Sequence, residues 1–170
     1  AALAEALKAL GEITVVAPLT QQSGQGGKTT EGELNVTDVE TKSGYPAKAV
    51  EGFPSDAVRV AIDDLGLKPD LVITGINEGQ NVGPAVDLSG TVGAARAAVA
   101  RGVPALATSQ GTSADETYDY DAAVPFILDP AYVIAFIHID HLEKARKHAP
   151  DIAAAAAARL TRPGLTVTTQ

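Results

Sequence analysis

Short apolar runs, separated by stretches with helical spacing, constrain the fold of this chain more than any other feature. The runs are residues 13–17 (ITVVA), 71–74 (LVIT) and 104–109 (PALATS), and each predicts a buried strand. Buried strands that alternate with helices are typical of open, mostly parallel sheets with helices on their faces. The sequence therefore predicts an α/β fold.

The stretches between these runs predict helices, one long loop and a weakly strand-like segment. Residues 3–10 carry leucines at helical spacing, residues 54–65 begin with a proline suited to a first helical turn, and residues 91–101 are rich in small side chains. Residues 18–33 are polar and glycine-rich and predict a loop. Residues 34–50 are weakly strand-like, with alternation over residues 34–37 and a turn near Ser43-Gly44.

Composition narrows the functional classes. The 170 residues suit a single domain over residues 1–170, and 45% hydrophobic with 20% charged residues predicts a globular chain. The net charge of -8 repels phosphate backbones, so a nucleic-acid polymer is excluded as the expected partner. A membrane partner is not expected either, since no apolar run approaches the length of about 18 residues that a span requires. Cysteine is absent, which excludes thiolate metal sites and cysteine nucleophiles.

Three polar loops follow the carboxyl ends of the predicted strands, where open α/β sheets bind their ligands. The segment from residue 74 to residue 83 reads T-G-I-N-E-G-Q-N-V-G, and its Asn77 and Asn81 offer amide oxygens suited to Mg²⁺ or Mn²⁺. Ser89-Gly90-Thr91 opens a helix whose free N–H groups suit a phosphate. Ser23, in the first loop, offers one more hydroxyl. The alternative is a tight turn whose asparagines cap its own backbone.

Residues 68–111 resemble the core of the SurE family, metal-dependent phosphatases that act as 5′/3′-nucleotidases. The resemblance rests on T-G-I-N-E-G-Q-N-V-G, S-G-T-V-G-A-A and P-A-L-A-T-S. Weaker matches are A-P followed by Ser23-Gly24, and the segment Gly52-Phe53-Pro54-Ser55-Asp56 at the start of a helix. The resemblance covers about residues 1–127 and leaves residues 128–170 poorly matched.

The resemblance implies a Rossmann-like, three-layer α/β/α domain with a mostly parallel sheet. It implies that Ser23 and Asn77 are metal ligands, that Asn81, Ser89, Gly90 and Thr91 line a phosphate site, and that Ser109 lies at its edge. The implied reaction is divalent-metal-dependent hydrolysis of nucleoside 5′- or 3′-monophosphates, or of other phosphomonoesters. The implied assembly is a homodimer or homotetramer, and we expect a cytoplasmic location, with a secreted or periplasmic form left open.

The family pattern also includes a strand ending in N-D-D-G, whose adjacent aspartates are the principal metal ligands and catalytic carboxylates. This sequence contains no such segment, so no catalytic residue is visible in it. The chain begins at Ala1, directly in a helical pattern, and we expect this start to be internal to a larger protein. The alternative function is therefore a non-catalytic nucleotide- or phosphate-binding domain.

Three other groups of polar residues have simpler interpretations. His138, Asp140 and His141 lack a complete ligand set and predict a surface helix rather than a metal site. Asp63-Asp64 ends a helix on the side of the sheet away from the strand carboxyl ends, so we exclude it as a catalytic pair. The acidic residues between positions 115 and 121 predict a solvated loop running into a helix; the alternative is a gate in which Tyr118 or Tyr120 stacks on a base.

Overall fold

A computed structural model of the chain describes residues 2–8, 11–111, 118–128 and 165–168, and its elements follow the predicted alternation of helices and strands. In chain order the elements are α1 (Ala2–Leu7), β1 (Ile13–Pro18), β2 (Val36–Glu40), β3 (Pro46–Val50), α2 (Pro54–Arg59), η1 (Val60–Asp64), β4 (Leu71–Glu78), η2 (Gly83–Leu88), α3 (Gly90–Ala100), β5 (Ala105–Gln110), α4 (Tyr120–Leu128) and β6 (Leu165–Thr168).

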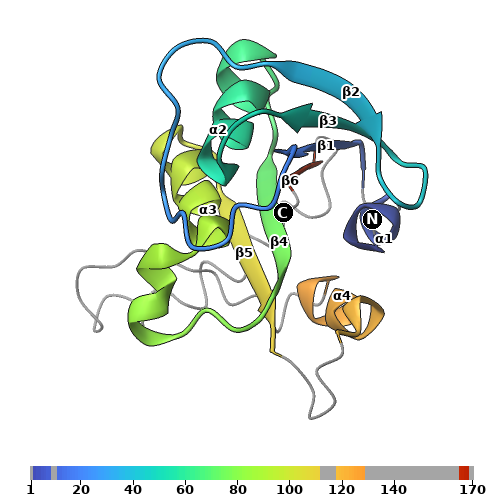
Figure 1. Ribbon diagram of the computed structural model, residues 1–170. Helices are drawn as coiled ribbons and strands as arrows, with labels where there is room; N and C mark the ends of the chain where they lie inside the picture. Colours follow the sequence, from blue (N-terminus) through green and yellow to red (C-terminus); the bar gives the residue numbers. More distant parts are fainter. Residues whose placement is uncertain (1, 9–10, 112–117, 129–164, 169–170) are drawn as a thin grey trace.

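The strands form one six-stranded sheet in the order β2-β3-β1-β6-β4-β5 (Figure 1). β3, β1, β6, β4 and β5 are parallel, and only β2 pairs antiparallel, with β3. The five parallel strands therefore end at the same edge of the sheet, which is where the predicted site residues should gather.

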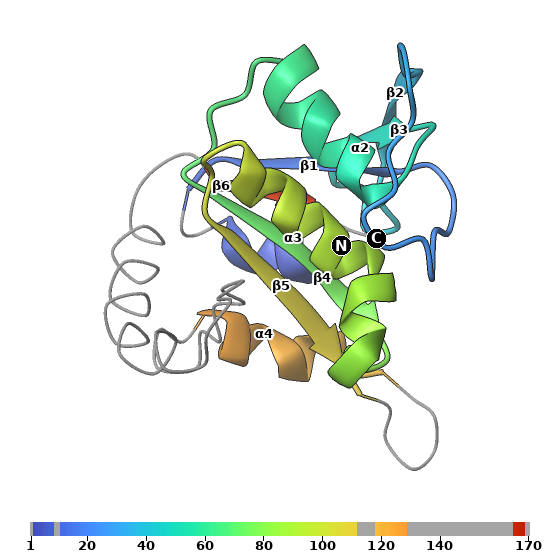
Figure 2. The ribbon, with the colours of Figure 1, turned by 90° about the vertical axis from the view of Figure 1, so that its left-hand side faces the viewer.

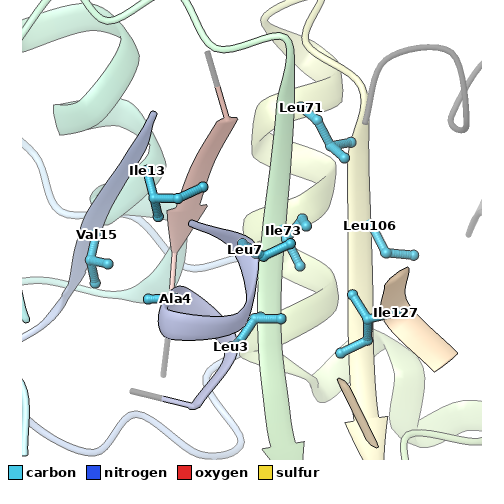
Figure 3. Close-up of a cluster of buried hydrophobic side chains, with 9 residues drawn as sticks. All are labelled: Leu3, Ala4, Leu7, Ile13, Val15, Leu71, Ile73, Leu106 and Ile127. Atoms are coloured by element: carbon cyan, nitrogen blue, oxygen red, sulfur yellow. The ribbon is translucent and has the colours of Figure 1, made fainter. Parts of the chain in front are cut away.

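Helices cover both faces of the sheet, which makes three layers. α2 and α3 lie on one face and α1 and α4 on the other (Figure 2). On the second face, Leu3 and Leu7 of α1 pack with Ile73 of β4, while Ile127 of α4 packs beside Leu106 of β5 (Figure 3). The neighbouring Val72 faces the other way, into a cluster with side chains of α2 and α3. The predicted three-layer α/β/α arrangement is confirmed.

Two elements differ from the predicted ones. β4 continues four residues beyond the predicted end, because Asn77 and Glu78 pair with Ser109 and Gln110 of β5 after a register shift. The helix from Pro54 changes from α to π geometry at Val60 and ends one residue early. Pairing with β5 explains why β4 is longer than predicted. The π geometry at the end of the helix is accompanied by the hydrogen bond from Leu65 N to Val60 O.

The last strand, β6, was not predicted. It is four residues long and lies in the middle of the sheet, parallel to both β1 and β4. The surface helix expected at residues 138–141 lies outside the described residues. Within the described parts of the chain, no helix combines the length and the apolar character needed to cross a membrane.

Candidate functional site

A close approach of three elements builds the floor of the site. Thr74 Oγ1 donates a 2.8 Å hydrogen bond to the Thr91 carbonyl, which ties β4 to the first turn of α3. Gly75, next along β4, has a φ of +96°, and a Cβ there would lie 2.4 Å from the Thr108 carbonyl of β5. Only glycine allows this approach. The carboxyl ends of β4 and β5 are therefore held against the amino end of α3.

Two predicted phosphate-site residues meet at this edge. Asn81 Nδ2 donates a 2.7 Å hydrogen bond to Ser109 Oγ, and Ser109 is also the register partner of Asn77. Ser109 is exposed, and both asparagines are partly buried. Asn77 Nδ2 donates to the Gly79 carbonyl at 2.8 Å, so the nitrogen is engaged and its amide oxygen is the atom left for a ligand. The capping turn predicted as the alternative is therefore present at Asn77.

Ser89, Gly90 and Thr91 lie at the amino end of α3, as predicted. Ser89 is the N-cap residue, and its Oγ accepts from Val92 N at 3.3 Å, which leaves the hydroxyl proton free for an anion. Thr91 is fully buried, and its Oγ1 has no hydrogen-bond partner among the described residues. An unsatisfied buried hydroxyl costs about 1–3 kcal/mol, so this group is a candidate donor to a bound ligand.

The loop between β1 and β2 covers the first turn of α3. Gly26 N donates to the Leu88 carbonyl at 2.9 Å, and a Cβ on Gly93 would lie 2.3 Å from the Gly26 oxygen. Ser23 precedes this contact by three residues and is exposed. Among the described residues, no hydrogen bond joins Ser23 to Asn77, so the structure does not bring these two predicted metal ligands together directly.

The chemistry of the available ligand atoms decides whether the predicted metal fits this site. Ser23 and Asn77 supply neutral oxygens, whereas Mg²⁺ and Mn²⁺ sites in proteins are built mainly on carboxylates. Over residues 2–8, 11–111, 118–128 and 165–168, no three His, Cys, Asp or Glu side chains cluster as a metal site. The described residues therefore do not form a divalent-cation site by themselves.

Glu78 and the tyrosines form a second polar group beside Ser109 and Gln110. The Tyr120 hydroxyl donates a short hydrogen bond to Glu78 Oε1, and the Tyr118 and Tyr120 rings stack with centroids 6.3 Å apart. Burial, and then this hydrogen bond, raise the pKa of Tyr120 to about 12. The sequence does not predict the hydrogen bond between Tyr120 and Glu78, because the two residues lie 42 positions apart.

The remaining polar groups keep their simpler interpretations where the structure describes them. Asp63 forms an ion pair with Arg101 at 2.8 Å, and it lies on η1, ahead of the amino end of β4. The pair Asp63-Asp64 is thus remote from the strand carboxyl ends. The segment from His138 to His141 lies outside the described residues.

Fold and site together define an open α/β domain with a group of polar residues at the carboxyl ends of its parallel strands. The family model described as "Survival protein SurE" matches residues 1–162. The chain belongs to the SurE family, as the motifs in its central loop indicated.

Similar proteins agree with this assignment. The chain is 42% identical over 137 residues to the 5′-nucleotidase SurE of Geotalea uraniireducens (strain Rf4), which covers 79% of this chain and 53% of the relative. It is 39% identical over 173 residues to the 5′-nucleotidase SurE of Halobacterium salinarum (strain ATCC 29341 / DSM 671 / R1), covering 95% and 64%. The crystal structure of the SurE protein from Aquifex aeolicus superposes with a TM-score of 0.61 at 33% identity, covering 74% of this chain and 52% of that one. The chain thus spans about half the length of the first of these relatives, and its fold is SurE-like.

Proposed function

We propose that this chain is the phosphate-binding domain of a phosphomonoesterase that hydrolyses nucleoside 5′- or 3′-monophosphates. The observation that carries the proposal is the buried, unpartnered Thr91 hydroxyl at the amino end of α3, next to the N-cap Ser89. Free N–H groups at a helix start and hydroxyl donors are the groups that bind and orient phosphoryl oxygens. The relatives named 5′-nucleotidase support the reaction.

Each group would have a separate role. The α3 N–H groups and the Ser89 and Thr91 hydroxyls would donate to phosphoryl oxygens, and the Asn81–Ser109 pair would border the ester. Gly26 of the β1–β2 loop lies against the first turn of α3, so the phosphoryl group would bind next to this loop. Ser23 and Asn77 would contribute two neutral oxygens to a shell for Mg²⁺ or Mn²⁺, and among the described residues no group of three His, Cys, Asp or Glu side chains gathers to complete it. A divalent cation supplies Lewis-acid polarisation of the phosphoryl group when it is bound.

Two exposed apolar side chains favour an ester with an apolar organic part. Val82 directly follows Asn81 and is 64% exposed, and Leu88 directly precedes Ser89 and is 63% exposed. Ligand sites combine apolar walls with a few convergent polar groups, so these two side chains suit a nucleoside beside the phosphate. The proposal also includes one domain over residues 1–170, a homodimer or homotetramer, and a cytoplasmic location.

The test is phosphate release from a panel of nucleoside monophosphates with Mn²⁺, Mg²⁺ or EDTA. It is run on this chain and on the same chain extended with a family strand ending in N-D-D-G. Release by the extended chain alone, abolished by EDTA, supports the phosphomonoesterase. Binding of nucleotide without release by either chain supports the second candidate, a non-catalytic binding domain, which the neutral donor set favours.

The proposed contact with the nucleoside part of the ester is tested with V82S. Val82 is exposed, so this substitution should change the free energy of unfolding little. We expect V82S to weaken binding of a nucleoside monophosphate and to leave binding of inorganic phosphate unchanged. Equal losses for both ligands would contradict the nucleoside assignment.

A further inference from the structure

A buried carboxylate near the start of α2 has partners that the proposed function does not use. Asp56 is 0% exposed. A charged side chain is seldom buried in this way unless hydrogen bonds or an opposite charge compensate for its lost hydration. Its partners therefore indicate what the rest of the fold requires of it.

Most of the hydrogen bonds to Asp56 come from a distant loop and not from its own helix. Thr30 N lies 3.0 Å from both carboxylate oxygens, and Thr30 Oγ1 donates to Oδ2 at 2.8 Å. Locally, only Phe53 N donates to Oδ2, at 2.9 Å, which is half of a capping box. Thr30 belongs to the loop between β1 and β2, the loop that carries Ser23.

Two more residues complete this contact. Arg59, one turn further along α2, donates from Nη2 to the Gly32 carbonyl at 3.0 Å, and its Nε lies 3.8 Å from Asp56 Oδ1. A Cβ on Gly52 would lie 2.8 Å from Asp56 Oδ2, so the backbone is in direct contact with the carboxylate. We call Asp56, Arg59, Thr30 and Gly32 the loop clamp.

The clamp holds one end of a segment whose other end lies on the candidate site. Gly26 is fastened to Leu88 and rests against Gly93 in the first turns of α3. Three residues separate Gly26 from Thr30 along the chain, so movement at Thr30 reaches Gly26 directly. Ser23 lies three residues before Gly26, so the course of the chain at Ser23 depends on both attachments.

We propose that Asp56 is a positioning residue: its buried carboxylate holds the Thr30–Gly32 segment and so sets the loop that carries Ser23 over the first turn of α3. The proposal rests on the proposed function for the identity of the site, while the clamp itself can be tested without any ligand. Charge-assisted hydrogen bonds are about twice as strong as neutral ones, so removing a single donor should open the loop measurably.

Trypsin tests the clamp, because Lys28 lies in the loop and is exposed. Thr30→Val removes the Oγ1 donor and keeps the backbone N–H, and we expect cleavage after Lys28 to accelerate about tenfold. Thr30→Ser restores the hydroxyl and should restore the slow rate. Asp56→Asn turns an amide toward donors and should accelerate cleavage further.

Two controls separate loop opening from general unfolding. Thr29→Val alters the exposed neighbour of Thr30, for which the described chain contains no hydrogen bond, and should leave the Lys28 rate unchanged. Lys42, exposed in the turn of the β2–β3 hairpin, should be cleaved at the same rate in every variant. If Thr30→Val leaves cleavage after Lys28 as slow as in the parent chain, the clamp is refuted.

Inorganic phosphate tests the link to the site. We expect Thr30→Val to weaken phosphate binding, measured calorimetrically, on the order of tenfold, and Thr30→Ser to restore it. A faster Lys28 cleavage with unchanged phosphate affinity would reduce Asp56 to a structural residue and overturn the positioning role. If the parent chain binds no phosphate or nucleotide, the proposed function fails and the positioning role with it, whereas the Lys28 rates still decide whether Asp56 holds the loop.

Discussion

The Thr74 side chain and the Thr91 backbone are joined by a fully buried hydrogen bond of 2.8 Å, from Oγ1 to the carbonyl oxygen. This bond attaches the first turn of α3 to β4, and the candidate site lies at the carboxyl end of that strand. The two residues are 17 positions apart, and both are at most 1% exposed.

Removing this bond should destabilise the domain. Thr74→Val keeps the shape of the side chain and deletes the donor, so we expect a loss of about 1–2 kcal/mol in the free energy of unfolding. Urea denaturation measures it, and Thr74→Ser should recover most of the loss. Thr37→Val, at an exposed position of β2, is the matched control and should change stability by less than about 0.5 kcal/mol. A Thr74→Val variant as stable as the parent would show that the hydrogen bond contributes nothing net.

The packing of the loop on α3 can be tested with two glycines. Gly93→Ala puts a Cβ 2.3 Å from the Gly26 oxygen, so we expect a loss of about 1–3 kcal/mol and weaker phosphate binding because the loop is displaced. Gly27→Ala adds the same methyl group where no atom lies within 4 Å, and it should be nearly neutral. Urea denaturation and calorimetry measure both effects, and similar behaviour of the two variants would contradict the described packing.

The raised pKa of Tyr120, caused first by burial and then by its hydrogen bond to Glu78, predicts a loss of stability at alkaline pH. The folded chain raises the pKa of Tyr120 to about 12, against about 10 for an unfolded tyrosine. The folded state therefore holds this proton more tightly, and the resulting stabilisation is complete below about pH 10 and is lost as the pH rises through about 12. Tyr120→Phe should flatten this part of the profile. Urea midpoints between about pH 9 and 12 measure it, and parallel profiles for the parent and the variant would refute the shift.

Metal removal gives a further prediction. The described residues offer neutral oxygens at Ser23 and Asn77, so EDTA should leave the thermal unfolding midpoint of this chain unchanged and Mn²⁺ should raise it little. The chain extended with an N-D-D-G strand should gain about 2.7 kcal/mol when Mn²⁺ is at a hundred times its dissociation constant.

A large Mn²⁺-dependent rise in the unextended chain, reversed by EDTA, would contradict this prediction. It would direct attention to His138, Asp140 and His141, outside the described residues. His138→Ala would then decide whether that segment supplies the ligands.

The local parts of the fold were predictable because each carries its signal within a few residues. The strands β1 and β5 follow from apolar runs that two helical layers cover, and α3 follows from an N-cap serine ahead of small side chains. The proximity of the polar residues that follow β4 and β5 was also predictable, because strand carboxyl ends meet at one edge. Asn81 and Ser109 do meet there, at 2.7 Å.

Contacts between distant segments were not predictable in the same way. The hydrogen bond from Thr30 to Asp56 spans 26 positions, and the one from Tyr120 to Glu78 spans 42. No periodic pattern in the sequence predicts either bond. The continuation of β4 through Glu78 follows from pairing with β5, since its residues include a glycine and an asparagine that disfavour strands on their own.

The amino-acid sequence by itself determined the alternation of helices and buried strands, the polar edge of the sheet and the family motifs. These depend on spacing and side-chain chemistry within a few residues. Tertiary structure alone decided that β6 lies between β1 and β4, that Gly26 rests on Gly93, and that Asp56 faces the loop. The physical reason is that pairing and burial depend on which surfaces meet, and residues far apart in the chain meet only when the whole sheet has formed.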